Sequence, residues 1–360
     1  MLPYLRDHHA DPGRVHAEGH ATRIAVEDAR EKVATFVDAR PREVVFTSSG
    51  TEAVNAAVFG ALGRAGADRD GLSLHVVATA VEHSSVLDAC RRSDAEVTLV
   101  AVDRLGRVDA ASVMAAVGDD TALVNVQLAN HEVGTLQPAA EVAAACRERG
   151  VLCHVDACAA VGYVPVDFAA LGADLVSITA HKMGGPKGVG ALLVRRGLRL
   201  PPLLVGGAQE RARRAGIENV PAIVGFGAAS LEAAGHLTAE HERLRSLTER
   251  VLEQAPKLVE GVTVYGDPDL RLPHLACLGV HGVEAEPVLV GLDRRGVAVH
   301  SGSSCSSETL EPSPVLEAMG VDAEHSLRVS VGWSSTDADV DAFLEAFPPV
   351  VEGLRALQAG

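Results

Sequence analysis

The sequence predicts an α/β fold, with a large domain whose mainly parallel sheet is covered by helices, followed by a smaller α+β domain. Up to residue 195, short and almost wholly apolar stretches alternate with amphipathic stretches. This alternation is typical of strands that helices bury on both faces. From residue 262 onward the pattern changes to short strands and helices. A chain of 360 residues is long enough to form both domains.

Apolar periodicity places the elements of the large domain in chain order. A first helix is expected over Thr22–Val37, where apolar residues recur at helical spacing. The strands expected after it are Glu43–Phe46, His75–Thr79, Glu96–Val100, Ala122–Gln127, Val151–Val155, Leu175–Ile178 and Val189–Arg195. The helices expected between them are Ala53–Leu62, Ser84–Arg91, Ala110–Val117 and Ala139–Arg149.

A long helical stretch, Val220–Gln254, is expected to bridge to the second domain. The short elements expected there are Val262–Tyr265, His274–Val280, Glu286–Arg294 and Val297–His300, then a strand at Ser326–Gly332 and a closing helix at Asp337–Leu357. We therefore assign residues 11–237 to the large domain and 238–360 to the small domain, and expect residues 1–10 to pack on the small one.

Composition excludes several classes of protein. The net charge of -16 argues against a nucleic-acid-binding surface and against an anionic membrane face. The N-terminus has no signal-peptide pattern, and no apolar run reaches the roughly 20 residues of a membrane span. The 6 cysteines are scattered without a CxxC pair or zinc-ligand spacing. These features predict a cytoplasmic protein with reduced thiols and no metal site.

Polar residues follow the predicted strands at their carboxyl ends, which is where parallel α/β sheets bind ligands. They are Thr51, Glu82 and His83, Asn130 and His131, Asp156, and His181 and Lys182. Each of them alone reads as an ordinary turn or capping residue. Their convergence on one edge of the sheet predicts a ligand site.

Pyridoxal phosphate (PLP) would explain all of these polar residues with one ligand. Lys182 follows a buried strand, where an ammonium is costly unless paired or deprotonated, and such lysines form Schiff bases. Asp156 could pair with a cationic heterocycle such as the PLP pyridinium. The hydroxyl-rich turn before Thr51 opens a helix and suits a phosphate. A mononucleotide would explain this turn but not the lysine.

Two further residues suggest chemistry. Cys305 is the only cysteine in a small, polar, serine-rich stretch, which predicts a mobile thiol able to take up a sulfur atom. The alternative interpretation is that Cys305 is a free surface cysteine without a role. Arg328, in a predicted strand, could clamp a carboxylate bidentately or form an ordinary surface ion pair. The loop Gly206–Gly216 is either solvated or reaches an anionic ligand across a subunit interface.

With these residues in place, the chain resembles the cysteine desulfurases of the NifS and IscS type, fold type I PLP enzymes of the class V aminotransferase superfamily. The resemblance covers essentially the whole chain. The stretches that carry it are Phe46–Glu52, Val81–Leu87, Ala129–Gly134, His154–Ala157, Ala180–Gly188 and Ser301–Cys305. The run Leu310–Leu316 resembles the long-loop subgroup, which supplies iron–sulfur cluster assembly and tRNA thiolation.

The resemblance implies conversion of L-cysteine to L-alanine, with the sulfur left on Cys305 as a persulfide for a sulfur-acceptor protein. It implies that Lys182 holds PLP and acts as base, that His83 stacks on the ring, and that Asp156 pairs with the pyridinium. The remaining roles would fall to Gly50, Thr51, Thr179 and His181 at the phosphate, His131 at the ring oxygen, and Arg328 and Asn130 at the substrate. A homodimer is also implied, with its site near the interface.

The sequence departs from the family pattern in several places. The family's opening strand and turn have no counterpart ahead of residues 1–4, which predicts a truncated or misassigned start. His131 replaces an Asn, Ala159 a Gln and Ile217 a Thr. Each lost hydrogen bond typically costs about 0.5–1.5 kcal/mol, so PLP is expected to bind less tightly.

Two alternatives to a desulfurase therefore remain. One is a selenocysteine lyase, or another PLP-dependent lyase or transaminase of the same fold. The other is a degenerate, non-catalytic scaffold that binds a partner protein.

Overall fold

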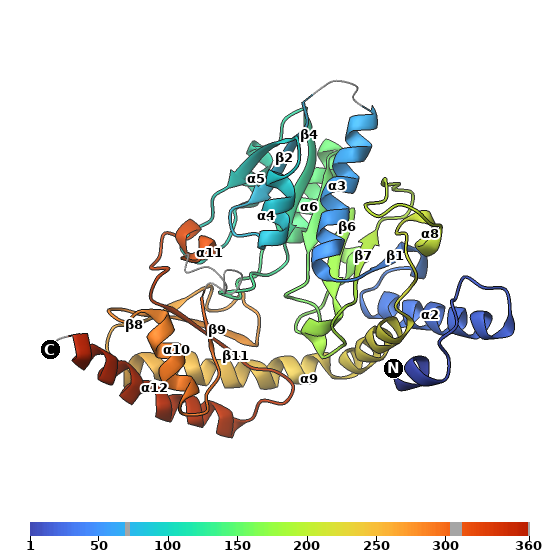
Figure 1. Cartoon of the computed structure of the whole chain (residues 1–360). Coiled ribbons are helices and arrows are strands. Elements are labelled where there is room, and N and C mark those ends of the chain that lie inside the picture. The colour runs from blue at the N-terminus through green and yellow to red at the C-terminus, as the bar shows by residue number, and fades with distance from the viewer. Residues whose placement is uncertain (69–72, 303–311, 359–360) are drawn as a thin grey trace. The chain divides into compact units, whose positions relative to one another are not determined.

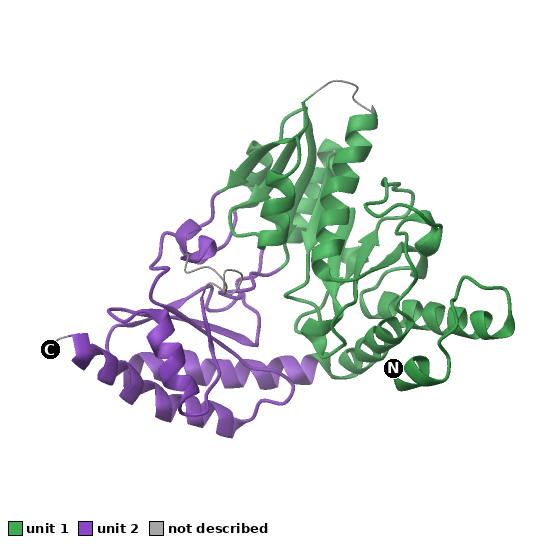
Figure 2. Cartoon of the chain, in the orientation of Figure 1, with its two compact units in different colours: residues 1–100, 109–128, 138–237 green, residues 101–108, 129–137, 238–360 purple. Residues whose placement is uncertain are grey.

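The computed structural model describes residues 1–68, 73–302 and 312–358. They form two compact units (Figure 2). Unit 1 comprises residues 1–100, 109–128 and 138–237, and unit 2 comprises residues 101–108, 129–137 and 238–360. Cys305 lies outside the described residues.

Unit 1 is built on a seven-stranded sheet in the order β1-β7-β6-β5-β4-β2-β3 (Figure 1). Its strands are β1 (Val44–Thr47), β2 (His75–Thr79), β3 (Glu96–Val100), β4 (Thr121–Gln127), β5 (Leu152–Asp156), β6 (Leu175–Thr179) and β7 (Gly190–Val194). The strand β7 runs antiparallel to both β1 and β6, whereas β2, β3, β4, β5 and β6 pair in parallel. Because β1 and β6 both run antiparallel to β7, they run in the same direction. The strand β1 therefore ends at the same edge as β6, β5, β4 and β2. The predicted mainly parallel sheet is confirmed.

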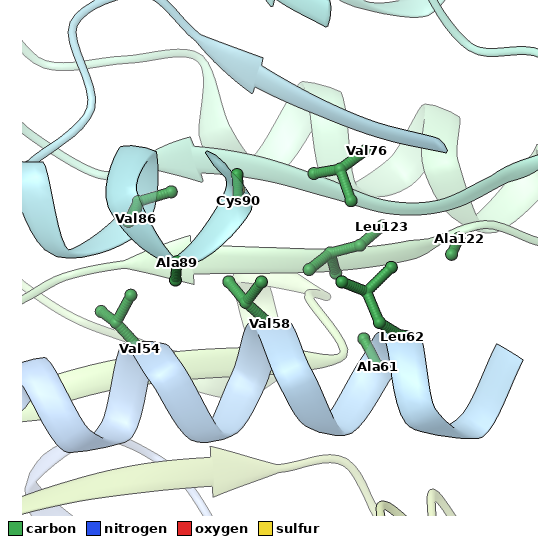
Figure 3. Close-up of a cluster of buried hydrophobic side chains, with 10 residues drawn as sticks. All are labelled: Val54, Val58, Ala61, Leu62, Val76, Val86, Ala89, Cys90, Ala122 and Leu123. Atoms are coloured by element: carbon green, nitrogen blue, oxygen red, sulfur yellow. The ribbon is translucent and has the colours of Figure 1, made fainter. Parts of the chain in front are cut away.

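The longer helices of unit 1 cover this sheet, as the alternating sequence pattern predicts, whereas α1 (Leu2–Arg6) buries no residue. The other helices are α2 (Ala17–Phe36), α3 (Gly50–Asp68), α4 (Ser84–Arg91), α5 (Ala110–Ala115), α6 (Ala139–Arg149), α7 (Phe168–Leu171) and α8 (Gln209–Ala212), with 3-10 turns η1 (Pro41–Glu43) and η2 (Ala180–Met183). The short α7 and α8 lack the length that apolar periodicity needs, and the sequence did not predict them. In α3 and α4, small side chains such as Val58 and Ala89 pack against Val76 of β2 and Leu123 of β4 (Figure 3). Aromatics make up only 3% of the chain, so valine, alanine and leucine fill this core.

Unit 2 contains a four-stranded antiparallel sheet in the order β10-β11-β9-β8. Its strands are β8 (Val262–Tyr265), β9 (Leu275–Val280), β10 (His300–Ser301) and β11 (Ser326–Ser330), and its helices are α10 (Ala285–Asp293), α11 (Pro314–Ala318) and α12 (Asp337–Gln358). The strand predicted at 297–300 forms only from His300, because the turn at Gly296, with a φ of 79°, delays it. The α+β character is as predicted.

The helix α9 (Val220–Leu258) contributes its first part to unit 1 and the rest to unit 2. Among the described residues, α9 is the one helix whose length and apolar composition would allow it to cross a membrane. A single such helix is a weak indication, since the core helix of a soluble protein passes the same test. Its apolar residues are partly used for packing: the buried Phe226 ring lies 6.3 Å from the ring of Phe46.

A buried ion pair anchors the loop 206–216 to the sheet. Glu210 accepts hydrogen bonds from both terminal nitrogens of Arg30, at 2.7 and 2.6 Å, and from the Phe46 N–H at 2.9 Å. The Arg30 guanidinium also lies 4.7 Å over the Phe46 ring. Burial alone would lower the pKa of Arg30, but the Glu210 carboxylate raises it above its usual value. The loop is therefore not simply solvated, and the pair holds Glu210 and Arg211 at unfavourable φ angles of 48° and 60°.

Replacing Glu210 should destabilise the fold strongly, because the buried Arg30 would lose its bidentate, buried anion and keep only the half-exposed Glu27. We expect Glu210→Ala to lower the free energy of unfolding by about 3–5 kcal/mol, measured by urea denaturation. Asp28→Ala removes the exposed pair with Lys32 and should cost about 1 kcal/mol or less. Equal losses in the two variants would contradict the role assigned to the buried pair.

Candidate active site

The carboxyl edge of the unit 1 sheet gathers most of the predicted site residues. They are Gly50 and Thr51 at the start of α3, His83 at the N-cap of α4, Asp156 at the end of β5, Thr179 at the end of β6, and His181 and Lys182 in η2. An ideal Cβ on Gly50 would lie 3.4 Å from the Thr179 Cβ. The turn after β1 and the end of β6 are therefore in close contact, as the strand-end argument predicts.

The turn Ser48–Thr51 is braced from several sides. Ser49 accepts a hydrogen bond from the Glu52 N–H at 3.1 Å, and Glu52 accepts one from the Ser48 N–H at 2.8 Å. Arg214, from the loop 206–216, donates to both Glu52 oxygens at 2.8 and 3.1 Å. Burial alone would raise the pKa of Glu52, but these hydrogen bonds lower it. The result is a fixed helix N-terminus whose N–H groups suit a phosphate.

Asp156 is buried at the end of β5, and Oδ1 of its carboxylate accepts a hydrogen bond from the Cys158 N–H at 2.9 Å. Two residues earlier, His154 is buried between Asn125 and Ser177, at 2.9 and 2.8 Å. Burial lowers the pKa of His154 to about 4, although the charge of Asp156 opposes this effect. His154 is therefore neutral at pH 7, and it supports the strand without adding charge to the site.

The orientation of His83 follows from its position as a helix cap. Its Nδ1 accepts a hydrogen bond from the Ser85 N–H at 3.0 Å and lies 2.8 Å from the Ser85 hydroxyl. Since Nδ1 acts as an acceptor, the neutral ring carries its proton on Nε2. The α4 N-terminus thus fixes both the ring and its tautomer.

Thr179, His181 and Lys182 lie together where β6 runs into η2. The Thr179 hydroxyl and His181 Nδ1 are 2.9 Å apart. Burial lowers the pKa of His181, and the charges of Lys182 and Lys187 lower it further. The strand β6 is buried along its length, as predicted, but Lys182 itself is exposed. The expectation of a buried ammonium is wrong for the single chain, because Lys182 lies in η2, beyond the last buried residue of β6.

Cys158, which lies two residues after Asp156, is a residue of this edge that the sequence patterns do not single out. Its side chain is partly exposed, and an ideal Cβ on Gly50 would lie 2.6 Å from its Sγ. The signal was its position, two residues after the strand-end Asp156. The candidate site therefore contains a second thiol in addition to the predicted Cys305.

Three other predicted residues belong to unit 2. The side-chain oxygen of Asn130 accepts hydrogen bonds from the N–H groups of Glu132 and Val133, both at 2.8 Å, so it shapes the turn after β4. Arg328 of β11 donates to the backbone oxygen of His131 at 3.0 Å. The His131 ring lies 3.5 Å from the buried Glu132 carboxylate. Asn130, His131 and Arg328 thus form one polar cluster within that unit.

Comparison with known proteins identifies the family. The model of the aminotransferase class-V family matches residues 1–343. The chain is 40% identical to cysteine desulfurase IscS 1 of Archaeoglobus fulgidus, over 99% of this chain and 94% of that protein. It is also 40% identical to a cysteine desulfurase of a Nostoc species, over 99% and 90%. The structure of a NifS-like protein superposes with a TM-score of 0.89 at 30% identity, covering 98% of this chain and 94% of that one.

The chain belongs to the aminotransferase class-V family and, within it, to the cysteine desulfurases. This family is PLP-dependent, acts on cysteine and passes sulfur to acceptor proteins. The sequence-based assignment of family and fold type is confirmed.

Gly50 and Cys158 should be energetically coupled. Gly50→Ala places a methyl group against the Cys158 thiol, and such overpacking costs about 1–3 kcal/mol. In a Cys158→Ala background the nearest remaining atoms are Thr179 Cβ at 3.4 Å and residue 158 Cβ at 3.6 Å, so the cost should largely disappear. Urea unfolding of the wild type, both single variants and the double variant measures this coupling. Strictly additive losses would refute the contact.

His154 should make stability depend on pH in acid. The folded pKa of about 4 lies below the usual 6.5, so the unfolded chain binds a proton that the native chain excludes. The stability from neutral His154 is therefore complete above about pH 6.5 and is lost as the pH falls towards 4, by at most about 3 kcal/mol. Urea unfolding between these pH values should show a flatter dependence for His154→Asn than for the wild type. The matched change His236→Asn, at an exposed position, should leave the slope unaltered.

Proposed function

We propose that this cysteine desulfurase family member uses PLP to convert L-cysteine to L-alanine and passes the sulfur, as a Cys305 persulfide, to an acceptor protein. The observation that carries the proposal is the convergence of a braced helix N-terminus, the strand-end Asp156 and Lys182 on one edge of the sheet. Family membership gives this arrangement its chemical meaning.

The donor set fits PLP by charge and by shape. The start of α3 offers N–H groups and hydroxyls to a phosphate, and the lack of a side chain at Gly50 lets Cys158 and Thr179 approach this turn closely. The buried carboxylate of Asp156 suits a protonated ring nitrogen, and Lys182 supplies a primary amine. We therefore assign the phosphate to Gly50, Thr51, Thr179 and His181. His131 is assigned to the ring oxygen.

When bound, PLP supplies an electron sink that lets the Cα proton of the amino acid leave. Lys182 is proposed to bind the cofactor and to move protons at the substrate Cα. His83, whose neutral ring carries a proton on Nε2, would flank the cofactor ring and donate that proton. Arg328 and Asn130 would bind the substrate carboxylate. In the overall reaction the Cβ–S bond of cysteine breaks, Cβ takes up a proton, and an S–S bond forms at Cys305.

We also propose a cytoplasmic homodimer, with residues 11–237 as the PLP-binding domain and 238–360 as the small domain. The segment 203–217 exposes the apolar side chains of Leu203, Leu204, Val205 and Ile217, which supports a subunit contact there. The proposed partners are L-cysteine and a sulfur-acceptor protein, without nucleic acid or membrane. The acidic charge of -16 favours an acceptor with a basic docking face.

Cys305→Ala should abolish sulfur transfer while the protein still binds PLP, because the acceptor thiol is lost and the cofactor residues remain. Purified protein would be scanned for PLP absorbance and assayed for alanine and sulfide with L-cysteine, L-selenocysteine and cysteine sulfinate. Cys90→Ala, which removes a thiol from the core around α4, should keep both properties. Sulfide release at the wild-type rate by Cys305→Ala would refute the sulfur-transfer role, and preference for selenocysteine would favour the lyase. A wild-type protein without PLP absorbance, even with added PLP, would indicate a scaffold.

A further inference from the structure

We propose that Ser85 is a positioning residue for His83: its hydroxyl accepts the second proton that the His83 ring must carry, on Nδ1, before Nε2 can release a proton. This inference rests on the proposed function, because it concerns the residue that is assigned to flank the cofactor ring. Ser85 itself has no assigned contact with cofactor or substrate, and it acts through the orientation and protonation of the ring.

Two groups of Ser85 meet the same nitrogen of His83. The Ser85 N–H donates to His83 Nδ1 at 3.0 Å, as the capping bond of α4. The Ser85 hydroxyl oxygen lies 2.8 Å from the same nitrogen. In the neutral ring Nδ1 offers one lone pair, which the backbone N–H already occupies. The hydroxyl is therefore a redundant donor while the ring is neutral.

Release of a proton from Nε2 changes what Nδ1 needs. A neutral ring that gave up its Nε2 proton would become an imidazolate anion, which is far too basic to form at neutral pH. The ring therefore has to take up a proton from solvent water on Nδ1 first, and it is neutral again once Nε2 has donated. His83 and Ser85 are half-buried rather than sealed in the core, so this exchange is open to them. In the doubly protonated ring both nitrogens are donors, and Nδ1 then needs an acceptor.

One of the two Ser85 groups can serve as that acceptor. The backbone N–H has no lone pair and points its hydrogen at Nδ1, so it opposes a proton there. The hydroxyl oxygen has two lone pairs, and rotation about its C–O bond turns it from donor to acceptor at the same 2.8 Å. The helix position increases the need for it, because the N-terminal end of α4 disfavours a positive charge. Ser85 thus offsets the cost that the helix cap imposes on the acid form of His83.

Other charged and titratable side chains lie on the edge of the sheet that carries His83, at the start of α3, before α4, at the end of β5 and after β6. They are Glu52, Glu82, Asp156, Cys158, His181 and Lys182. Glu82 is buried and accepts hydrogen bonds from the Thr79 hydroxyl at 2.6 Å and the Gln127 N–H at 2.8 Å. A substitution of Ser85 leaves all of these groups in the chain. A difference in His83 protonation between Ser85 variants therefore reports on the hydroxyl.

The first test compares Ser85→Ala, Ser85→Thr and Ser84→Ala with the wild-type full-length chain, all without PLP. Protonation of His83 would be followed by NMR of isotope-labelled histidine side chains over a pH series, with His83→Asn to assign the signals. Without the acceptor, Ser85→Ala should need about 0.5–1 pH unit more acid to protonate His83, as the loss of one hydrogen bond implies. Ser85→Thr keeps a hydroxyl and should titrate like the wild type. Ser84→Ala, which removes a hydroxyl from the same turn, should do so too.

The second test loads the same variants with PLP and measures alanine formation from L-cysteine across the pH range. The kcat of Ser85→Ala should decline at a lower pH on the alkaline side, because the acid form of His83 is depleted earlier. Beyond that limit we expect about a three- to tenfold lower kcat, which matches the shift expected in the apoprotein. Towards acid pH the kcat should approach that of the wild type, and Ser85→Thr should restore the whole profile.

An unchanged His83 titration in Ser85→Ala, or a Ser85→Thr variant that behaves like Ser85→Ala, would overturn the inference. A shifted titration without a matching shift in the alkaline limb of kcat would overturn it as well, because His83 would then not act in its acid form. A wild type that binds no PLP contradicts the proposed function instead, and the apoprotein titration still decides on the bond between Ser85 and His83. Apoprotein melting temperatures identify a general loss of stability, which by itself would leave the titration of His83 in the folded protein unchanged.

Discussion

The candidate site depends on the close approach of the turn after β1 to the ends of β5 and β6. Two glycines make this approach possible. An ideal Cβ on Gly190 of β7 would lie 2.6 Å from the Ser49 carbonyl carbon, and one on Gly50 would lie 2.6 Å from the Cys158 thiol. Any larger side chain at either position would push the turn Ser48–Thr51 away from Asp156 and Thr179. The arrangement proposed for the site therefore requires glycine at positions 50 and 190.

The loop 206–216 supports this turn from outside the sheet. Its Glu210 pairs with Arg30 and binds the Phe46 N–H of β1, and its Arg214 pairs with Glu52 at the start of α3. The first contact fixes the strand before the turn, and the second fixes the helix after it. The backbone strain at residues 210–212 is thus offset by ion pairs that hold the N-terminal end of α3 in place.

Sequence patterns were sufficient for the features that repeat along the chain. Apolar strands followed by polar residues located Asp156, His181 and His83, because the ends of parallel strands share one edge. The same reasoning could not find Glu210, since its partner Arg30 is 180 residues distant and neither residue lies in a periodic pattern. It also misjudged the burial of Lys182 and did not single out Cys158. The direction in which η2 leaves the sheet, and the packing of a thiol against a glycine, are tertiary facts that no local pattern encodes. The roles assigned to Asn130, His131 and Arg328 stay predictions, although one unit brings the three together.

The chemistry of the cysteines bears on which of them can carry sulfur. A sulfur-accepting thiol must ionise and must reach the solvent or a partner. Burial raises the pKa of Cys90 and Cys277 to about 12, and that of Cys158 well above the usual value. The hydrogen bond with Cys146, together with burial, raises the pKa of Cys153 well above the usual value. A hydrogen bond from Cys153 lowers the pKa of Cys146, but Cys146 is fully buried. Among the cysteines that the structure describes, none combines a thiolate with access. This supports the proposal that the sixth cysteine, Cys305, carries the persulfide; its serine-rich surroundings already distinguish it in the sequence.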